Sequence, residues 1–100
     1  MVIAYDPAKR AWTLRERGLD FEEAQEVFAG PTFDQEDDRR DYGEVRLITI
    51  GLLRGQMVVL VWTRRGNARH IISMRRANER EKKRYGTEIE ARRQRHEEGR

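Results

Sequence analysis

The chain has no cysteine, few prolines and few histidines among its 100 residues. The absence of cysteine excludes disulfides, zinc–thiolate centres and cysteine nucleophiles, and it fits a reducing compartment. Long apolar runs are also missing, so no stretch approaches the length that spans a bilayer, and residues 1–4 are too short for the apolar core of a signal peptide. A chain of this length forms one modest core. We therefore expect a single small domain in the cytoplasm, with no membrane-bound segment.

Charge is abundant but unevenly distributed along the chain. The net charge is only +3, yet residues 64–84 carry nine Lys and Arg against two glutamates, whereas residues 34–44 carry six carboxylates against two arginines. A basic segment of this kind predicts an anionic partner, and nucleic acid is the leading candidate. The alternative is that the clustering only reflects a chain in which 39% of the residues are charged.

The order of the apolar patterns predicts an α+β fold. A short β-prone segment, 2–5, is followed by Asp6-Pro7, which favours a helix over 7–17 because Asp caps the first turn and Pro needs no hydrogen-bond acceptor there. A second helix with an Asp20-x-x-Glu23 cap should end at Gly30-Pro31.

Beyond the acidic loop at 34–44, the period changes to the alternation of strands. Three segments joined by glycine-containing turns predict an antiparallel meander: 44–53, 57–64 and 68–75. From Asn78 onward the pattern is that of a charged C-terminal helix. We expect one domain over 1–87 and a charged tail over 88–100 that frays, because the tail has no apolar face.

Arginines gather where the last predicted strand ends. Strict alternation gives two faces: Ile71, Ser73 and Arg75 on one, and His70, Ile72 and Met74 on the other. Guanidinium groups match phosphate oxygens, so arginines on one concave sheet face would bind a nucleic-acid backbone. The competing interpretation is that they cap the sheet and pair with the acidic loop. His70, beside Ile and Met, fits a partly buried structural side chain better than a catalytic base.

Three stretches in this order carry a family resemblance: YDPAKRAWTLRERGLDFEEAQEVF (5–28), TRRG (63–66) and IISMRRANEREKKRY (71–85). With the acidic loop between the first two, the chain from residue 2 to about 86 resembles the BrnT family of toxins from bacterial type II toxin–antitoxin systems. The resemblance implies a RelE-like fold and a metal-independent ribonuclease that needs no cofactor and inhibits translation. It also implies RNA as substrate and a BrnA-type antitoxin as partner, with a heterotetramer as a possible assembly.

The resemblance also assigns site residues by position. Arg65 matches the arginine of the family's T-x-R-G turn, Arg75 and Arg76 match its R-R-A pair, and Lys9 matches its first-helix lysine. Family members commonly close that helix with N-x-x-K-H-G, whereas this chain has Thr13, Glu16 and Arg17 before Gly18. The expected catalytic residues are Arg65, Arg75, Arg76 and His70, and the expected RNA-binding residues are Lys9, Arg64, Arg80, Lys83 and Arg84.

The implied mechanism is internal transesterification, in which the ribose 2′-OH attacks the adjacent phosphate. Arginines would stabilise the charge of the transition state, but they cannot easily accept a proton because the pKa of a guanidinium exceeds about 12. The proton acceptor stays open among His70, Glu16, Lys9 and Tyr85. A nucleic-acid-binding module without chemistry, or a protein whose basic surface only binds an acidic antitoxin, remains the alternative function.

Overall fold

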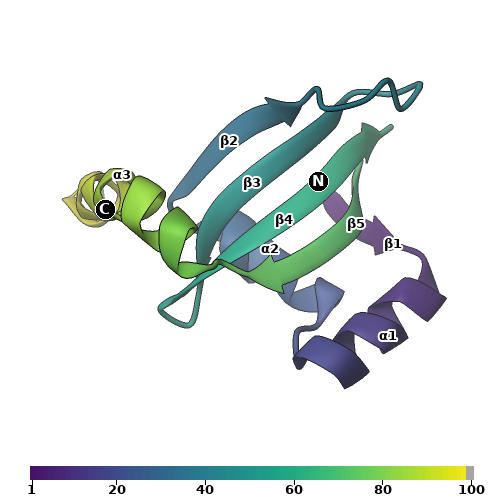
Figure 1. The fold of residues 1–100 in the computed structure, drawn as a ribbon, viewed down its shortest axis with the longest axis horizontal. Helices are drawn as coiled ribbons and strands as arrows, with labels where there is room; N and C mark the ends of the chain where they lie inside the picture. The colour runs from purple at the N-terminus through teal and green to yellow at the C-terminus, as the bar shows by residue number, and fades with distance from the viewer. Residues whose placement is uncertain (99–100) are drawn as a thin grey trace.

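The computed structural model describes residues 1–98 and contains one mixed sheet with helices at its faces and edge (Figure 1). The strands are β1 (Val2–Tyr5), β2 (Thr32–Asp37), β3 (Arg46–Leu53), β4 (Gln56–Arg65) and β5 (Ala68–Arg76). The helices are α1 (Pro7–Arg17), the short 3₁₀ helix η1 (Phe21–Glu23), α2 (Ala24–Ala29) and α3 (Glu79–Glu98). The predicted α+β class is confirmed.

The sheet has the strand order β1-β5-β4-β3-β2, so the predicted meander β3-β4-β5 forms its centre. β1 adds to one side by pairing parallel with β5. β2 adds to the other side by pairing antiparallel with β3, from Thr32 opposite Gly51 to Asp37 opposite Arg46. The first part of the expected acidic loop is therefore an edge strand. Solvent-facing carboxylates are tolerated at an edge, and Asp34 also accepts a 2.6 Å hydrogen bond from Thr49 Oγ1 on β3.

One face of the sheet packs against η1 and α2 and carries the main core. Phe21, Val27 and Leu60 are fully buried there. Gly51 on β3 permits this packing, since a Cβ at that position would lie 2.7 Å from Val27 Cγ1. α1 lies alongside β5 and ends at Gly18, whose φ of 68° suits a residue without a side chain.

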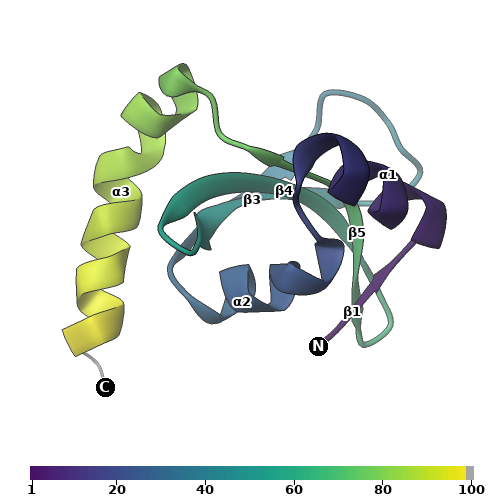
Figure 2. The same cartoon turned by 90° about the horizontal axis from the view of Figure 1, so that it is seen from below.

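The opposite face is only partly covered. α3 packs over one end of it and buries Tyr85 and Ile89 against a second cluster of apolar residues: Ile50, Met57, Val59, Ala77 and the partly buried Phe33, Ile48 and Leu52. Figure 2 shows α3 standing at one side of the sheet, and Figure 1 looks onto the face that it leaves open, with α2 behind. We call this the open face.

The helix continues through much of the predicted tail. Where the sequence led us to expect fraying from residue 88, α3 runs to Glu98, and residues 99–100 lie outside the described part. Ile89 is buried, and Arg92 donates a 2.7 Å hydrogen bond to the carbonyl of Thr32 on β2. A single apolar side chain and one long arginine thus dock a segment that is otherwise charged. Within residues 1–98, no helix is long and apolar enough to cross a membrane.

Candidate functional site

A bulge in β5 decides which side chains reach the open face. The ladder between β4 and β5 shifts between Val61, which lies opposite Ser73, and Trp62, which lies opposite Ile71. Ile72 is the extra residue, and an extra residue reverses the alternation beyond it. His70, Ser73 and Arg75 therefore share the open face, whereas Ile71 and Met74 both lie in the main core. The strict alternation that placed His70 with Met74 was wrong.

The open face carries a cavity of about 250 Å³ beside the start of α3, which we call the sheet groove. Its floor is apolar and comes from β3 and β4, while polar side chains from β2, β5, α3 and the segment after β2 form its walls. The floor residues are Ile48, Ile50, Val59 and Val61, and the wall residues are Gln35, Arg39, Ser73, Arg75, Glu81 and Tyr85.

Arg75 is held at the groove by a two-pronged ion pair. Its Nη1 and Nη2 donate to Glu81 Oε1 and Oε2 over 2.7 and 2.8 Å. Glu81 is itself fixed by the capping box of α3, in which it accepts from the Asn78 N–H and Asn78 Oδ1 accepts from the Glu81 N–H. The hydrogen bonds from Arg75 lower the pKa of Glu81 to about 2, and the same contact raises the pKa of Arg75. Both groups are charged at neutral pH.

A second guanidinium comes from the segment that follows β2. Arg39 Nε and Nη2 donate to Asp37 Oδ1 and Oδ2 over 2.7 and 2.8 Å, and the Tyr42 hydroxyl donates to the same carboxylate. Asp37 is only 4% exposed, and its pKa falls to about 2, chiefly because of the hydrogen bonds from Arg39. The buried carboxylate thus orients Arg39, which lines the groove with Arg75.

Arg65 and His70 lie on the same face but at the far end of the sheet. Arg65 pairs with Ala68, and Arg75 lies opposite Val59, which is six positions before Arg65 on β4, so the two arginines are about 20 Å apart along the sheet. Arg65 Nη2 lies 3.4 Å from Glu44 Oε1. Burial lowers the pKa of His70, and the charge of Arg65 lowers it further, so His70 is neutral at pH 7. Three members of the predicted catalytic set, Arg65, His70 and Arg75, are thus divided between two ends of one face.

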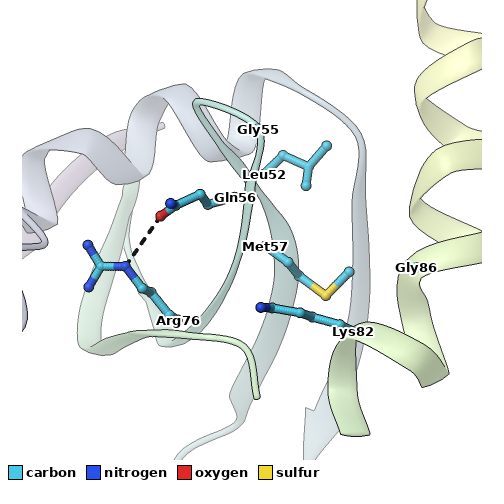
Figure 3. Close-up of a pocket in the computed structure, with 7 residues that line it drawn as sticks. All are labelled: Leu52, Gly55, Gln56, Met57, Arg76, Lys82 and Gly86. Atoms are coloured by element: carbon cyan, nitrogen blue, oxygen red, sulfur yellow. Dashed lines mark hydrogen bonds between the residues drawn. The ribbon is translucent and has the colours of Figure 1, made fainter. Parts of the chain in front are cut away.

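Arg76 lies on the opposite face, where it joins β5 to α1. Its Nη1 donates to the Arg17 carbonyl over 2.6 Å and its Nε to Gln56 Oε1 over 3.3 Å, while Arg17 Nη1 donates to the Met74 carbonyl. Figure 3 shows Arg76 and Gln56 on one side of a cavity of about 440 Å³, with Lys82 of α3 on the other side. The guanidinium groups of Arg75 and Arg76 therefore lie on opposite faces of the sheet.

The predicted RNA-binding residues are exposed, but they come from three places. Lys9 lies on α1, Arg64 lies near the end of β4 on the same face as Arg76, and three residues lie on the first turns of α3: Arg80, Lys83 and Arg84. The Arg84 guanidinium lies 5.3 Å from the centre of the Tyr85 ring. Of the four proton acceptors that the sequence left open, Tyr85 lines the groove.

Sequence reasoning missed two charged residues of the groove, Arg39 and Glu81. Asn78-x-x-Glu81 is a capping-box pattern that is visible in the sequence. It would have placed Glu81 in the first turn of the C-terminal helix, close to the end of the strand that carries Arg75. No comparable signal marked Arg39, which stands within a run of charges. Among the side chains that the structure describes, no group of three or more His, Asp or Glu is placed to hold a metal ion.

The comparison with known families assigns the chain. The model described as "Ribonuclease toxin, BrnT, of type II toxin-antitoxin system" matches residues 5–81, well over half of the chain. No curated protein matches it. The match ends at Glu81, so it includes both guanidinium groups of the sheet groove and the carboxylate that holds Arg75. The chain therefore belongs to the BrnT family of ribonuclease toxins from type II toxin–antitoxin systems, and membership of such a system implies an antitoxin partner.

Proposed function

We propose that this ribonuclease toxin cuts RNA in the sheet groove, with Arg75 at the scissile phosphate. The observation that carries the proposal is the convergence of two oriented guanidinium groups, a carboxylate and a phenol on an apolar floor. The guanidinium group of an arginine can donate two parallel hydrogen bonds to the oxygens of one phosphate. An apolar floor strengthens such contacts because it excludes water. The ion pair with Glu81 already holds Arg75 in an orientation in which a phosphate can replace the carboxylate.

The groove supplies the groups that transesterification needs. The ribose 2′-oxygen attacks phosphorus and gives up its proton to Glu81, the bond from phosphorus to the 5′-oxygen breaks, and Tyr85 gives its hydroxyl proton to that oxygen. Transfer of the proton from Glu81 to the Tyr85 oxygen through solvent then restores both groups. The products are a 2′,3′-cyclic phosphate and a 5′-hydroxyl end. Arg75 and Arg39 stabilise the charge that develops on the phosphoryl oxygens, an effect of about 2.7–4 kcal/mol for each well-placed donor. Because the hydrogen bonds from Arg75 hold the pKa of Glu81 at about 2 until a phosphate displaces the carboxylate, Glu81 is a weak acceptor in the free protein, and we expect slow cleavage.

The far end of the open face binds the rest of the RNA strand. Arg65 and His70 lie too far from Arg75 to touch the same phosphate, but a strand laid along β5 passes both ends. Basic side chains on the first turns of α3 add to the attraction: Arg80, Lys83 and Arg84. Since these contacts are electrostatic, affinity falls as salt rises.

The proposed reaction uses no metal ion. We also propose that the toxin acts in the cytoplasm, and that its sheet and C-terminal helix are arranged as in RelE-type toxins. Its partner is a BrnA-type antitoxin, and a heterotetramer is the assembly that we propose. An antitoxin that covers the open face would block RNA directly, because both would contact the same side chains, and a standard interface buries about 800 Å² per partner. Complex formation and RNA binding then exclude each other.

The experiment is cleavage of an end-labelled RNA by the purified chain in excess chelator. We expect cleavage that persists in chelator, products with cyclic phosphate ends, and no cleavage where a 2′-deoxynucleotide replaces the ribonucleotide at the cut site. Addition of the antitoxin encoded next to the toxin gene should stop the reaction. Strict dependence on added magnesium, or cutting at the 2′-deoxy site, contradicts the mechanism. Binding without any cleavage would favour the alternative, a nucleic-acid-binding module without chemistry.

A further inference from the structure

The first helix carries a tryptophan whose side chain is about half exposed. Trp12 of α1 is 46% exposed, whereas the other tryptophan, Trp62, is 6% exposed and donates a hydrogen bond to Thr49 Oγ1 in the core. The Arg17 guanidinium lies 5.1 Å from the centre of the Trp12 ring and so contacts one side of it. Arg17 is in turn anchored by its hydrogen bond to the Met74 carbonyl. The indole is therefore held in place while much of it faces solvent.

Trp12 lines a cavity of about 380 Å³ between α1 and β5, which we call the α1 cavity. Lys9 and Arg17 contribute positive charge to its lining, and Ile72 and Ser73 of β5 form its other side. Ile72 is the bulged residue, so the bulge that turns Arg75 onto the open face also directs an apolar side chain to this cavity. The α1 cavity is a separate space from the sheet groove.

The two spaces are neighbours because they share one residue. Ser73 lines both the α1 cavity and the sheet groove, and Arg75 follows it by two positions on the same face of β5. A strand whose phosphate lies at Arg75 therefore passes the mouth of the α1 cavity within the span of one nucleotide. An aromatic ring with cations beside it is the arrangement that binds a single-stranded base by stacking and its backbone by charge.

We propose that the α1 cavity binds the base next to the scissile phosphate, with the base stacked on Trp12 and its phosphate near Lys9. The inference rests on the proposed cleavage in the sheet groove and adds a subsite to it. Double-stranded RNA does not fit, because a paired base cannot leave its stack to reach the ring at low cost. Trp12 acts as a positioning residue that sets which nucleotides are cut and how tightly RNA binds.

The test uses fluorescence of the two tryptophans separately. Trp62→Phe leaves Trp12 as the only reporter, and Trp12→Phe leaves Trp62, each in the full chain with folding checked by circular dichroism. The probe is a single-stranded RNA oligonucleotide with 2′-O-methyl groups, which binds without being cut. We expect quenching in the variant that keeps Trp12 and little change in the variant that keeps only Trp62. Should Trp62→Phe not fold, the difference between the parent and Trp12→Phe gives the same signal.

Kinetics supply the second readout. Trp12→Ala should weaken RNA binding and raise KM about 5- to 150-fold, the range found for loss of one base stack, and Trp12→Phe should restore most of the affinity. The single-turnover rate at saturating RNA should change less than KM. Unchanged KM in Trp12→Ala with normal cleavage would overturn the subsite and leave the proposed function intact. Quenching by the antitoxin but not by RNA would also overturn it and assign the cavity to the protein partner.

Discussion

Glu81→Gln is the substitution that tests two roles of Glu81 at the groove: its ion pair with Arg75, which stabilises the fold, and its proposed role as proton acceptor. Glutamine occupies the same volume and can still accept the Asn78 N–H, so the capping box of α3 survives. The change removes the negative charge that pairs with Nη1 and Nη2 of Arg75. Any loss of stability then reports the ion pair, and any loss of cleavage reports the carboxylate as proton acceptor.

The magnitude follows from the pKa of Glu81. A fall from 4.5 to about 2 corresponds to at most about 3.4 kcal/mol of folding stability at neutral pH. The Arg75 side chain is 42% exposed, however, and solvent screens the pair. We therefore expect Glu81→Gln to lower the free energy of unfolding by about 1–2 kcal/mol at pH 7. For a domain of this size that is a fall in Tm of about 4–16 °C.

The stability difference between the parent and Glu81→Gln should depend on pH, in a direction set by the pKa shift of Glu81. Because folding lowers the pKa of Glu81, the pair stabilises the protein fully above pH 4.5 and loses its effect as the pH falls toward 2. The difference between parent and variant in urea denaturation should therefore shrink over that interval. Glu79→Gln is the matched control, since that side chain is 85% exposed and its pair with Lys82 lies at the surface. Equal stability of parent and Glu81→Gln at pH 7, or a difference that persists unchanged at pH 2.5, would refute the reasoning.

The same variant tests the chemistry. Loss of the proton acceptor should slow RNA cleavage about 100-fold or more while RNA binding persists, because Arg75 remains and no longer has a competing carboxylate. Cleavage at the parent's rate would show that Glu81 is not the proton acceptor and would make Tyr85, which also lines the groove, the next candidate.

Two further substitutions test the packing that positions the site. Ile89→Ala should lower the free energy of unfolding by about 2–5 kcal/mol in chemical denaturation, because Ile89 is buried and docks the second half of α3; an unchanged midpoint would show that this half is not docked. Gly51→Ala should cost about 1–3 kcal/mol, because the new Cβ would lie 2.7 Å from Val27 Cγ1; a stability equal to the parent's would mean that α2 shifts freely.

Local chemistry made much of the fold predictable. The Asp6 cap, Pro7 and Gly18 each act on their immediate neighbours, and α1 begins and ends where they indicate. The three strands of the meander also match, because alternation and tight turns are local properties. The edge strand β2 was missed because Asp34, Gln35 and Glu36 are exposed at an edge, so its sequence has the composition of a loop.

The candidate site was harder to predict because it depends on contacts between distant residues. The extra residue Ile72 reverses the faces of β5, and nothing in the alternation of 68–75 marks it. Arg75 and Arg76 look equivalent in the sequence, yet the pleat places them on opposite faces, one in the groove and one against the end of α1. Arg39 reaches the groove only because buried Asp37 holds it, which is a tertiary effect.

The most direct test of the central claim is the single-turnover rate of RNA cleavage in chelator for Arg75→Ala and Arg76→Ala beside the parent. If RNA is cut in the sheet groove, Arg75→Ala should slow cleavage about 100- to 1,000-fold, since one transition-state donor is lost. Arg76→Ala should destabilise the fold but keep most of the rate under conditions in which it is folded, because its guanidinium contacts the Arg17 carbonyl and Gln56 on the other face. Cleavage by folded Arg75→Ala at the parent's rate, or a selective loss in Arg76→Ala, would contradict the assignment of the groove.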